Sequence, residues 1–188
     1  FLEDMNKAAA AQKPYFDKVQ SMSYEQISHD PEITAFILSS GKALFADNCA
    51  ACHQAGGQGV VGFFPNLTDD DWLYGGSYEQ IHQTLVNGRR GYMPSFGEVL
   101  SGAQISDLAN YVASLSGIAH DAAKAKAGDV LFHSETAACY YCHGVDAKGR
   151  KEIGAPNLTD GIWLWAGVAA APSGEGKVAA IRTVISGG

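Results

Sequence analysis

The chain contains an internal repeat: four short blocks occur twice in the same order, about 90 residues apart. Gly-x-x-Leu-Phe occurs at 41–45 and 128–132, Cys-x-x-Cys-His at 49–53 and 139–143, PNLTD at 65–69 and 156–160, and a tryptophan block at 72–74 and 163–165. Four matching blocks in one order indicate that a unit was duplicated. We therefore predict two tandem copies of one small fold.

Helix start and stop signals predict that both copies are all-α. Asp30 followed by Pro31 is a typical helix N-terminus, with Asp as the cap and Pro in the first turn. Capping boxes begin at Ser77 and Ser101, and the run from Ser23 to Gln26 is expected to start a short helix. Glycines at 88 and 117 are predicted to end the helices that follow the two boxes. A unit of this size with a few short helices has little core of its own, so a covalently held apolar group would complete it.

The two Cys-x-x-Cys-His motifs are typical of covalent attachment sites for haem c. The chain has four cysteines, and all of them lie in these motifs: Cys49 and Cys52 in the first copy, Cys139 and Cys142 in the second. A histidine directly after each pair, His53 or His143, would bind the iron from one side. Disulfides or a shared zinc site are alternatives, but neither explains why a histidine follows each pair. We therefore predict two haems c as cofactors.

Met93 is the predicted sixth ligand of the first iron, because a thioether opposite imidazole is the usual ligation of electron-transferring cytochromes c. The second copy has no methionine after His143. The run at 84–88 that precedes Met93 matches the run at 183–187, and Met93 lies five residues past Gly88. The equivalent position lies beyond Gly188, so we predict that the natural sequence continues and has a methionine within one or two residues of it.

Six further residues are candidates for the haem environment. A metal-bound histidine usually donates its second N–H to a carbonyl or carboxylate, so the carbonyl of Pro65 is the candidate partner of His53, with Pro156 as its counterpart in the second copy. Arg89 and Arg90 directly precede the Met93 loop, where a guanidinium could pair with a haem propionate. Trp72 and Trp163 are core aromatics or line the haem.

The overall charge limits the choice of partners. The net charge is −7 and the pI is about 5.2, which argues against nucleic-acid binding and suits a partner with a basic patch. No stretch of the sequence approaches the ~20 apolar residues that a membrane helix needs. Because the first residue is Phe1 and not Met, we expect the chain to be a trimmed or partial product.

Longer stretches of the sequence resemble one family. FPNLTDDDWLYGG at 64–76, the run at 81–94 that ends in GRRGYMP, ISDLANYVASLSG at 105–117 and GAPNLTDGIWLW at 154–165 are similar to the diheme c-type cytochrome subunit (subunit III) of cbb3-type cytochrome c oxidases, the C-family haem–copper oxidases. The segment at 15–32 resembles the connection from that subunit's membrane anchor to its first haem domain.

The resemblance implies two tandem class I cytochrome c domains, each with one haem c. Residues 1–29 would follow a membrane anchor, 30–117 would form the first domain, 118–127 the linker and 128–188 a second domain truncated at its C-terminus. The subunit would have no catalytic residues of its own. It would relay electrons from a periplasmic donor cytochrome to the catalytic subunit, beside a monohaem subunit, at the periplasmic face of the bacterial inner membrane.

Two other functions compete with this one. A soluble periplasmic diheme cytochrome c would use the same haem chemistry without an anchor. A diheme peroxidase or gas sensor would need an open iron site, which a second haem without methionine would provide. The ligand state of the second haem distinguishes this last class from a pure electron relay.

Overall fold

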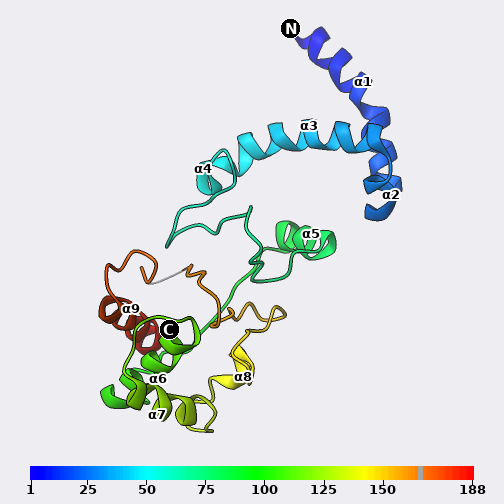
Figure 1. Ribbon diagram of the computed structural model, residues 1–188. Helices are drawn as coiled ribbons and strands as arrows, with labels where there is room; N and C mark the ends of the chain where they lie inside the picture. The colour runs from blue at the N-terminus through cyan, green and yellow to red at the C-terminus, as the bar shows by residue number, and fades with distance from the viewer. Residues whose placement is uncertain (165–166) are drawn as a thin grey trace. The chain divides into compact units, whose positions relative to one another are not determined.

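The computed structural model describes residues 1–164 and 167–188. In these residues the secondary structure is helical, apart from two isolated β-bridges. Trp165, the predicted counterpart of Tyr74, lies outside the described residues. The chain divides into two compact units, Phe1–Gly56 and Gly57–Gly188 (Figure 1).

The first unit consists of α1 (Leu2–Ser21), α2 (Tyr24–Ser28), α3 (Pro31–Asn48) and the short α4 (Ala50–His53). Phe36 of α3 joins α1 to α3, because its ring stacks on Tyr15 at 4.9 Å and meets Phe16 edge-on at 5.0 Å. Lys18 of α1 also donates to Asp30, the N-cap of α3, at 2.7 Å. Ile33 is fully buried. The sequence pattern did not predict α1.

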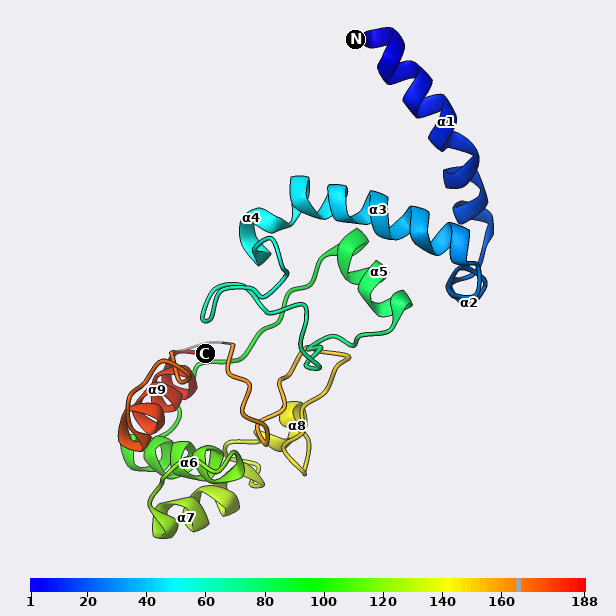
Figure 2. The ribbon, with the colours of Figure 1, turned by 45° about the horizontal axis from the view of Figure 1, so that its top comes forward.

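The second unit contains α5 (Tyr78–Asn87), α6 (Gly102–Leu115), α7 (Ala122–Phe132), α8 (Tyr140–His143) and α9 (Gly174–Gly187). Helices α6, α7 and α9 lie side by side, with α6 between the other two (Figures 1 and 2). The segment predicted as a linker, 118–127, is partly helical, since α7 begins within it at Ala122. Asp121 caps this helix by accepting from the backbone N–H groups of Ala123 and Lys124.

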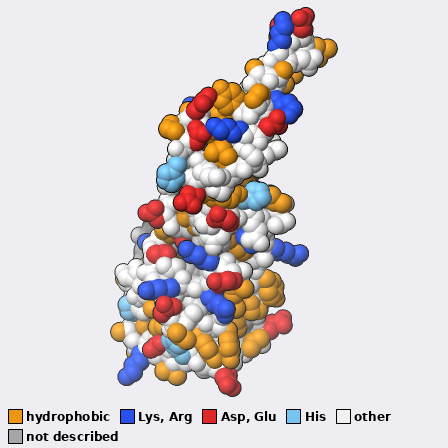
Figure 3. All heavy atoms as spheres, turned by 90° about the vertical axis from the view of Figure 1, so that its right-hand side faces the viewer, with side chains coloured by type: hydrophobic (Ala, Val, Ile, Leu, Met, Phe, Trp, Pro, Cys, Tyr) orange, Lys and Arg blue, Asp and Glu red, His pale blue; other side chains and the backbone are white. Residues whose placement is uncertain are grey.

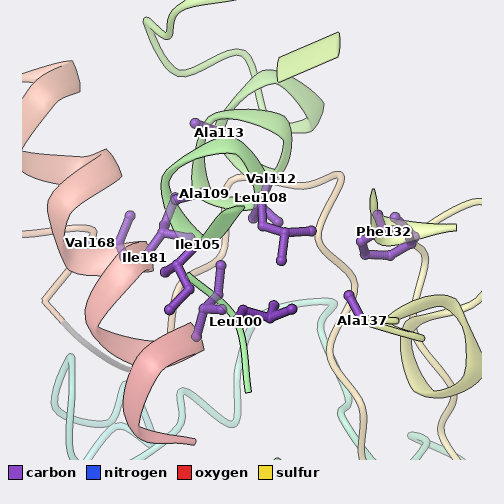
Figure 4. Close-up of a cluster of buried hydrophobic side chains, with 12 residues drawn as sticks. Leu100, Ile105, Leu108, Ala109, Val112, Ala113, Phe132, Ala137, Val168 and Ile181 are labelled. Carbon is purple, nitrogen blue, oxygen red and sulfur yellow. The ribbon is translucent and has the colours of Figure 1, made fainter. Parts of the chain in front are cut away.

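The core of the second unit lies against α6 (Figure 4). The buried face of α6 carries Ile105, Leu108, Ala109, Val112 and Ala113, at the spacing of one helical stripe. Phe132 from α7 and Ile181 from α9 approach this stripe from two sides, and both are almost fully buried. Asn110, the buried polar residue of the stripe, donates to the carbonyl of Ser106 and accepts from the N–H of Asp121, which ties the start of α7 to α6.

Helix α6 therefore packs against α7 and α9, whereas the predicted first domain, 30–117, groups α6 with α3. Gly128 lies where α7 meets α6, and a Cβ there would overlap the carbonyl of Asp107 and approach Cβ of Tyr111 to 2.8 Å. The boundaries of the two cytochrome domains stay predictions.

The predicted helix starts are confirmed. Capping boxes form at Ser23, Ser77 and Ser101, each with the side chain accepting from the backbone N–H of the glutamine three residues on. Asp30 caps α3, with Pro31 in its first turn. The C-cap of α5 is Gly88, as predicted, whereas α6 ends at Leu115 with Ser116 as its cap, one residue before Gly117.

Candidate haem centres

Each Cys-x-x-Cys-His motif forms one short helical turn. In the second copy the N–H of His143 donates to the carbonyl of Cys139 at 2.9 Å, and in the first copy His53 bonds to Cys49 at the same distance. Positions three and four residues apart lie on one face of a helical turn, so both thiols and the imidazole of a motif share a face. The four cysteines are unpaired thiols. This is the arrangement that two thioether bonds and an axial imidazole require.

The imidazole of His143 is oriented by a main-chain carbonyl. Its Nδ1 lies 3.1 Å from the carbonyl oxygen of Pro156, which orients the ring and makes Nδ1 the donor nitrogen. Burial lowers the pKa of His143, with the Pro156 carbonyl acting in the opposite direction, so burial favours the neutral ring that binds metals. In the part of the chain that the structure describes, Nε2 makes no hydrogen bond.

Burial also affects the first thiol of this motif. It raises the pKa of Cys139 to about 11, so the unmodified group is a neutral thiol at physiological pH. Cys142, by contrast, is exposed. A neutral, half-buried thiol beside an apolar core is compatible with a thioether, which carries no charge.

The PNLTD loop at 156–160, which contains the Pro156 carbonyl, has the same local structure as the PNLTD loop at 65–69. Oδ1 of Asn157 accepts from the N–H and the hydroxyl of Thr159, at 2.9 and 2.8 Å. Oδ1 of Asn66 does the same for Thr68, at 2.9 and 2.7 Å. An isolated bridge precedes each turn, 60 with 64 and 150 with 155. The duplication is therefore visible in the hydrogen bonds as well as in the sequence.

His133 holds the segment that follows the second motif. Its Nε2 lies 2.9 Å from the carbonyl of Val145, and its Nδ1 lies 2.9 Å from the carbonyl of Asp129. These two acceptors raise the pKa of His133, because only the imidazolium has a proton on both nitrogens. No local sequence pattern predicts this role for His133.

Met93 is half-buried and packs, together with Phe96, against the hydrophobic core of the second unit. His53 and Met93 belong to different units, so their pairing across one iron stays a prediction, as does the pairing of His53 with Pro65. The roles of Arg89 and Arg90 also stay predictions. The guanidinium of Arg89 donates to Thr84 and Gln83, both at 3.1 Å, and lies over the ring of Tyr74. Arg90 is exposed.

The two predicted tryptophans have different surroundings. Trp163 is partly buried and packs against the core of the second unit. Trp72 is also partly buried, its ring lies within 2.8 Å of the position that a Cβ on Gly76 would take, and its carbonyl accepts from the N–H of Gly75. The structure thus supports the core role of Trp163, whereas haem contact by either ring stays a prediction.

Large apolar side chains of the second unit remain exposed at the second motif, in the loop after the first motif and on α5. Tyr141 within the second motif and Val145 just after it are exposed, as are Val61 and Phe63 in the loop of the first copy. Helix α5 is amphipathic, yet Leu85 on its apolar face is 74% exposed. A haem has two broad apolar faces, and apolar side chains of this kind are what it would cover.

Charges of both signs are spread over the face of the molecule shown in Figure 3, with hydrophobic side chains between them. Among the described residues, no helix combines the length and the hydropathy needed to cross a membrane.

Comparison with known proteins identifies the family. Residues 37–112 match the family described as cytochrome c oxidase, cbb3-type, subunit III. The chain is 46% identical over 175 residues to the cbb3-type cytochrome c oxidase subunit FixP of Azorhizobium caulinodans, an alignment that covers 88% of this chain and 57% of the relative. It is 42% identical over 162 residues to the subunit CcoP of Rubrivivax gelatinosus, covering 86% of this chain and 50% of the relative. The chain belongs to the cbb3-type oxidase subunit III family.

Membership of the subunit III family agrees with the resemblance found in the sequence. It supports haem c as the type of cofactor, since the matched family is a cytochrome c family. The matched range, 37–112, includes the first Cys-x-x-Cys-His motif and Met93. The chain spans about half the length of these curated relatives.

Proposed function

We propose that this chain is the electron-transfer part of a cbb3-type oxidase subunit III and carries two haems c. The thiols of Cys49 and Cys52, and of Cys139 and Cys142, would hold the two porphyrins through thioether bonds. His53 and His143 would each bind one iron, and Met93 would be the second axial ligand of the first. A bound haem c would supply a reversible one-electron couple.

The contact between His143 and Pro156 is the observation that best supports this proposal. It leaves Nε2 for the iron and places a hydrogen-bond acceptor behind the ring, which is how metal-bound histidines are normally held. The same carbonyl lies in a loop whose twin in the first copy carries Pro65. The residues present therefore fit two covalently bound haems.

In the complex, the chain would take electrons from a donor cytochrome c and pass them to the catalytic subunit, next to the monohaem subunit. The complex would reduce oxygen and pump protons, whereas this subunit would contribute no catalytic residue. We place it at the periplasmic face of the inner membrane, held by an N-terminal anchor of the longer protein. The relatives are named as oxidase subunits, which supports these partners.

Redox titration and purification of the natural full-length protein test this function. We expect two one-electron transitions, reduction by a cytochrome c donor and co-purification with the oxidase. A protein that transfers electrons but leaves the membrane in a salt wash without the oxidase would instead be the soluble diheme shuttle.

The open-site alternative is tested separately. If the reduced full-length protein binds carbon monoxide readily at the second haem, the relay reading fails and a sensor or peroxidase is favoured. We expect no such binding, because the proposed function fills both axial positions of both irons.

A further inference from the structure

The loop that carries Met93 is capped on its C-terminal side by the second copy. The N–H groups of Phe96 and Gly97 donate to the carbonyls of Ile185 and Ser186, at 3.1 and 3.0 Å. The hydroxyl of Ser95 donates to the carbonyl of Ser186 at 2.5 Å. These carbonyls belong to the C-terminal turn of α9 (Gly174–Gly187). The Met93 loop is therefore bonded to the main chain of α9.

The loop lies so close to α9 that no residue larger than glycine fits at position 97 without a shift of the backbone. A Cβ on Gly97 would come within 2.8 Å of the Ser186 carbonyl oxygen, closer than real Cβ contacts. The backbone of Met93 is also close to Gly188: a Cβ on that glycine would lie 2.5 Å from the carbonyl oxygen of Met93. Met93 and Phe96 add apolar contact with the core that contains Ile185. The segment that follows Met93 is thus fixed to the second copy by backbone hydrogen bonds, close packing and apolar contact.

Tyr74 lies beside the N-terminal side of the loop. The hydroxyl of Tyr74 lies 3.0 Å from the position of a Cβ on Gly91, two residues before Met93. The same ring fills the space above Gly154 of the second copy, whose φ of +68° favours glycine. The guanidinium of Arg89 lies over the ring of Tyr74, 5.1 Å from the ring centroid. The C-terminal flank of the loop is therefore bonded to the second copy, and the N-terminal flank lies beside a ring that packs on the second copy.

We propose that the second copy positions Met93, so that methionine ligation of the first iron depends on the folded second copy and above all on the last turn of α9. This inference rests on the proposed function, because it assumes that Met93 is an iron ligand. Ser95, Phe96 and Gly97 are then positioning residues. A loop bonded to α9 would keep the thioether near one place, whereas a released loop would allow water or another side chain to take its position.

Two variants of the natural full-length holoprotein test the proposal. Ser95→Ala removes one hydrogen bond to Ser186, and Gly97→Ala forces the loop away from α9. Gly102→Ala and Gly41→Ala are the controls: a Cβ on either glycine meets nothing within 4 Å. Covalent haem content and helix content establish that each variant is folded.

Met93 ligation is measured by the methyl resonance of the iron-bound methionine in the reduced protein, assigned by its loss in Met93→Leu. The second measurement is the pH at which Met93 is replaced in the ferric protein. We expect the population with Met93 dissociated to rise about fivefold in Ser95→Ala and tenfold or more in Gly97→Ala, as the loss of one or two hydrogen bonds would give. The controls should match the wild type.

If Met93 binds iron in the wild type and its ligation is unchanged in both variants, the positioning role is wrong. The proposed function is then unaffected. A wild-type protein with covalent haem but no Met93 resonance would overturn both. If Gly97→Ala does not fold, Ser95→Ala decides alone, since it removes one hydroxyl and adds no atoms.

Discussion

Gly128 of α7 lies against the main-chain carbonyl of Asp107 in α6, with no space between them for a side chain. This contact explains why α6 packs so closely on α7. The same Gly-x-x-Leu-Phe block occurs in α3, where a Cβ on Gly41 would meet nothing within 4 Å. Two equivalent glycines therefore have opposite surroundings.

We predict that Gly128→Ala destabilises the protein by about 1–3 kcal/mol, because the added methyl group forces the two helices apart. Gly41→Ala is the matched control and should be neutral or stabilising by up to about 1 kcal/mol, since alanine favours a helix. Denaturant unfolding of the holoprotein measures both. The reverse ranking would mean that the close contact of Gly128 with Asp107 does not limit stability.

Gln54, which follows the first motif, has a backbone that favours glycine. Its φ is 68° and its ψ 161°, and the equivalent Gly144 has 80° and 156°. Residues other than glycine seldom adopt this region, at a cost of about 1–3 kcal/mol. Gln54→Gly should therefore raise the free energy of unfolding by about 1 kcal/mol, after the greater freedom of glycine in the unfolded chain is taken into account.

Gly144→Ala should lower the unfolding free energy by about 1–3 kcal/mol for the same reason. A lower unfolding free energy for Gln54→Gly would contradict a left-handed backbone at Gln54.

Asn157 supports the carbonyl that orients His143. Asn157→Ala removes both acceptor contacts to Thr159, and we expect the second copy to lose about 1–3 kcal/mol, from two net hydrogen bonds. The ferric spectrum of the second haem should also broaden, because the ring of His143 becomes less well oriented. Asn157→Asp retains the acceptor oxygen and should lie near the wild type, so equal losses in both variants would argue against the acceptor role.

His133 should make stability depend on pH. Its pKa is raised in the folded state by the carbonyls of Val145 and Asp129, so the folded protein binds this proton more tightly than the unfolded chain. The stabilisation is fully present below the unfolded pKa, near 6.5, and is lost as pH rises through the higher folded pKa. We expect this slope in unfolding titrations from pH 5 to 9. His133→Gln should flatten it, and an unchanged slope would show that His133 is not its source.

Local signals in the sequence predicted the helix starts well. The caps at Asp30, Ser77 and Ser101 depend on side chains within three residues, so no tertiary information was needed. The partner of α6 was harder to predict, because Gly-x-x-Leu-Phe occurs in both α3 and α7 and no local rule chooses between them. Helix α1 was not predicted because it has no side-chain cap at its start, where Phe1 precedes it, and because Pro14 lies inside it.

Some residues of the candidate site could likewise be predicted from the sequence, and others could not. The motif residues Cys139, Cys142 and His143 follow from spacing alone. A proline carbonyl was predicted to accept a hydrogen bond from a motif histidine, and His143 makes such a bond to Pro156. By contrast, the supporting roles of Tyr74 and His133 depend on contacts between distant segments, which no short pattern encodes. The xNxT turns at Asn66 and Asn157 carried a readable signal, since asparagine often accepts from the backbone two residues on.

The number and location of covalently attached haems tests the central claim most directly. The natural full-length protein, matured in a host that attaches haem c, is denatured, cleaved between the two copies and analysed by mass spectrometry. We predict one covalent haem on the peptide with Cys49 and Cys52 and one on the peptide with Cys139 and Cys142, and the loss of only the second in the double variant Cys139→Ser with Cys142→Ser. A denatured protein without covalent haem on either copy would contradict the account.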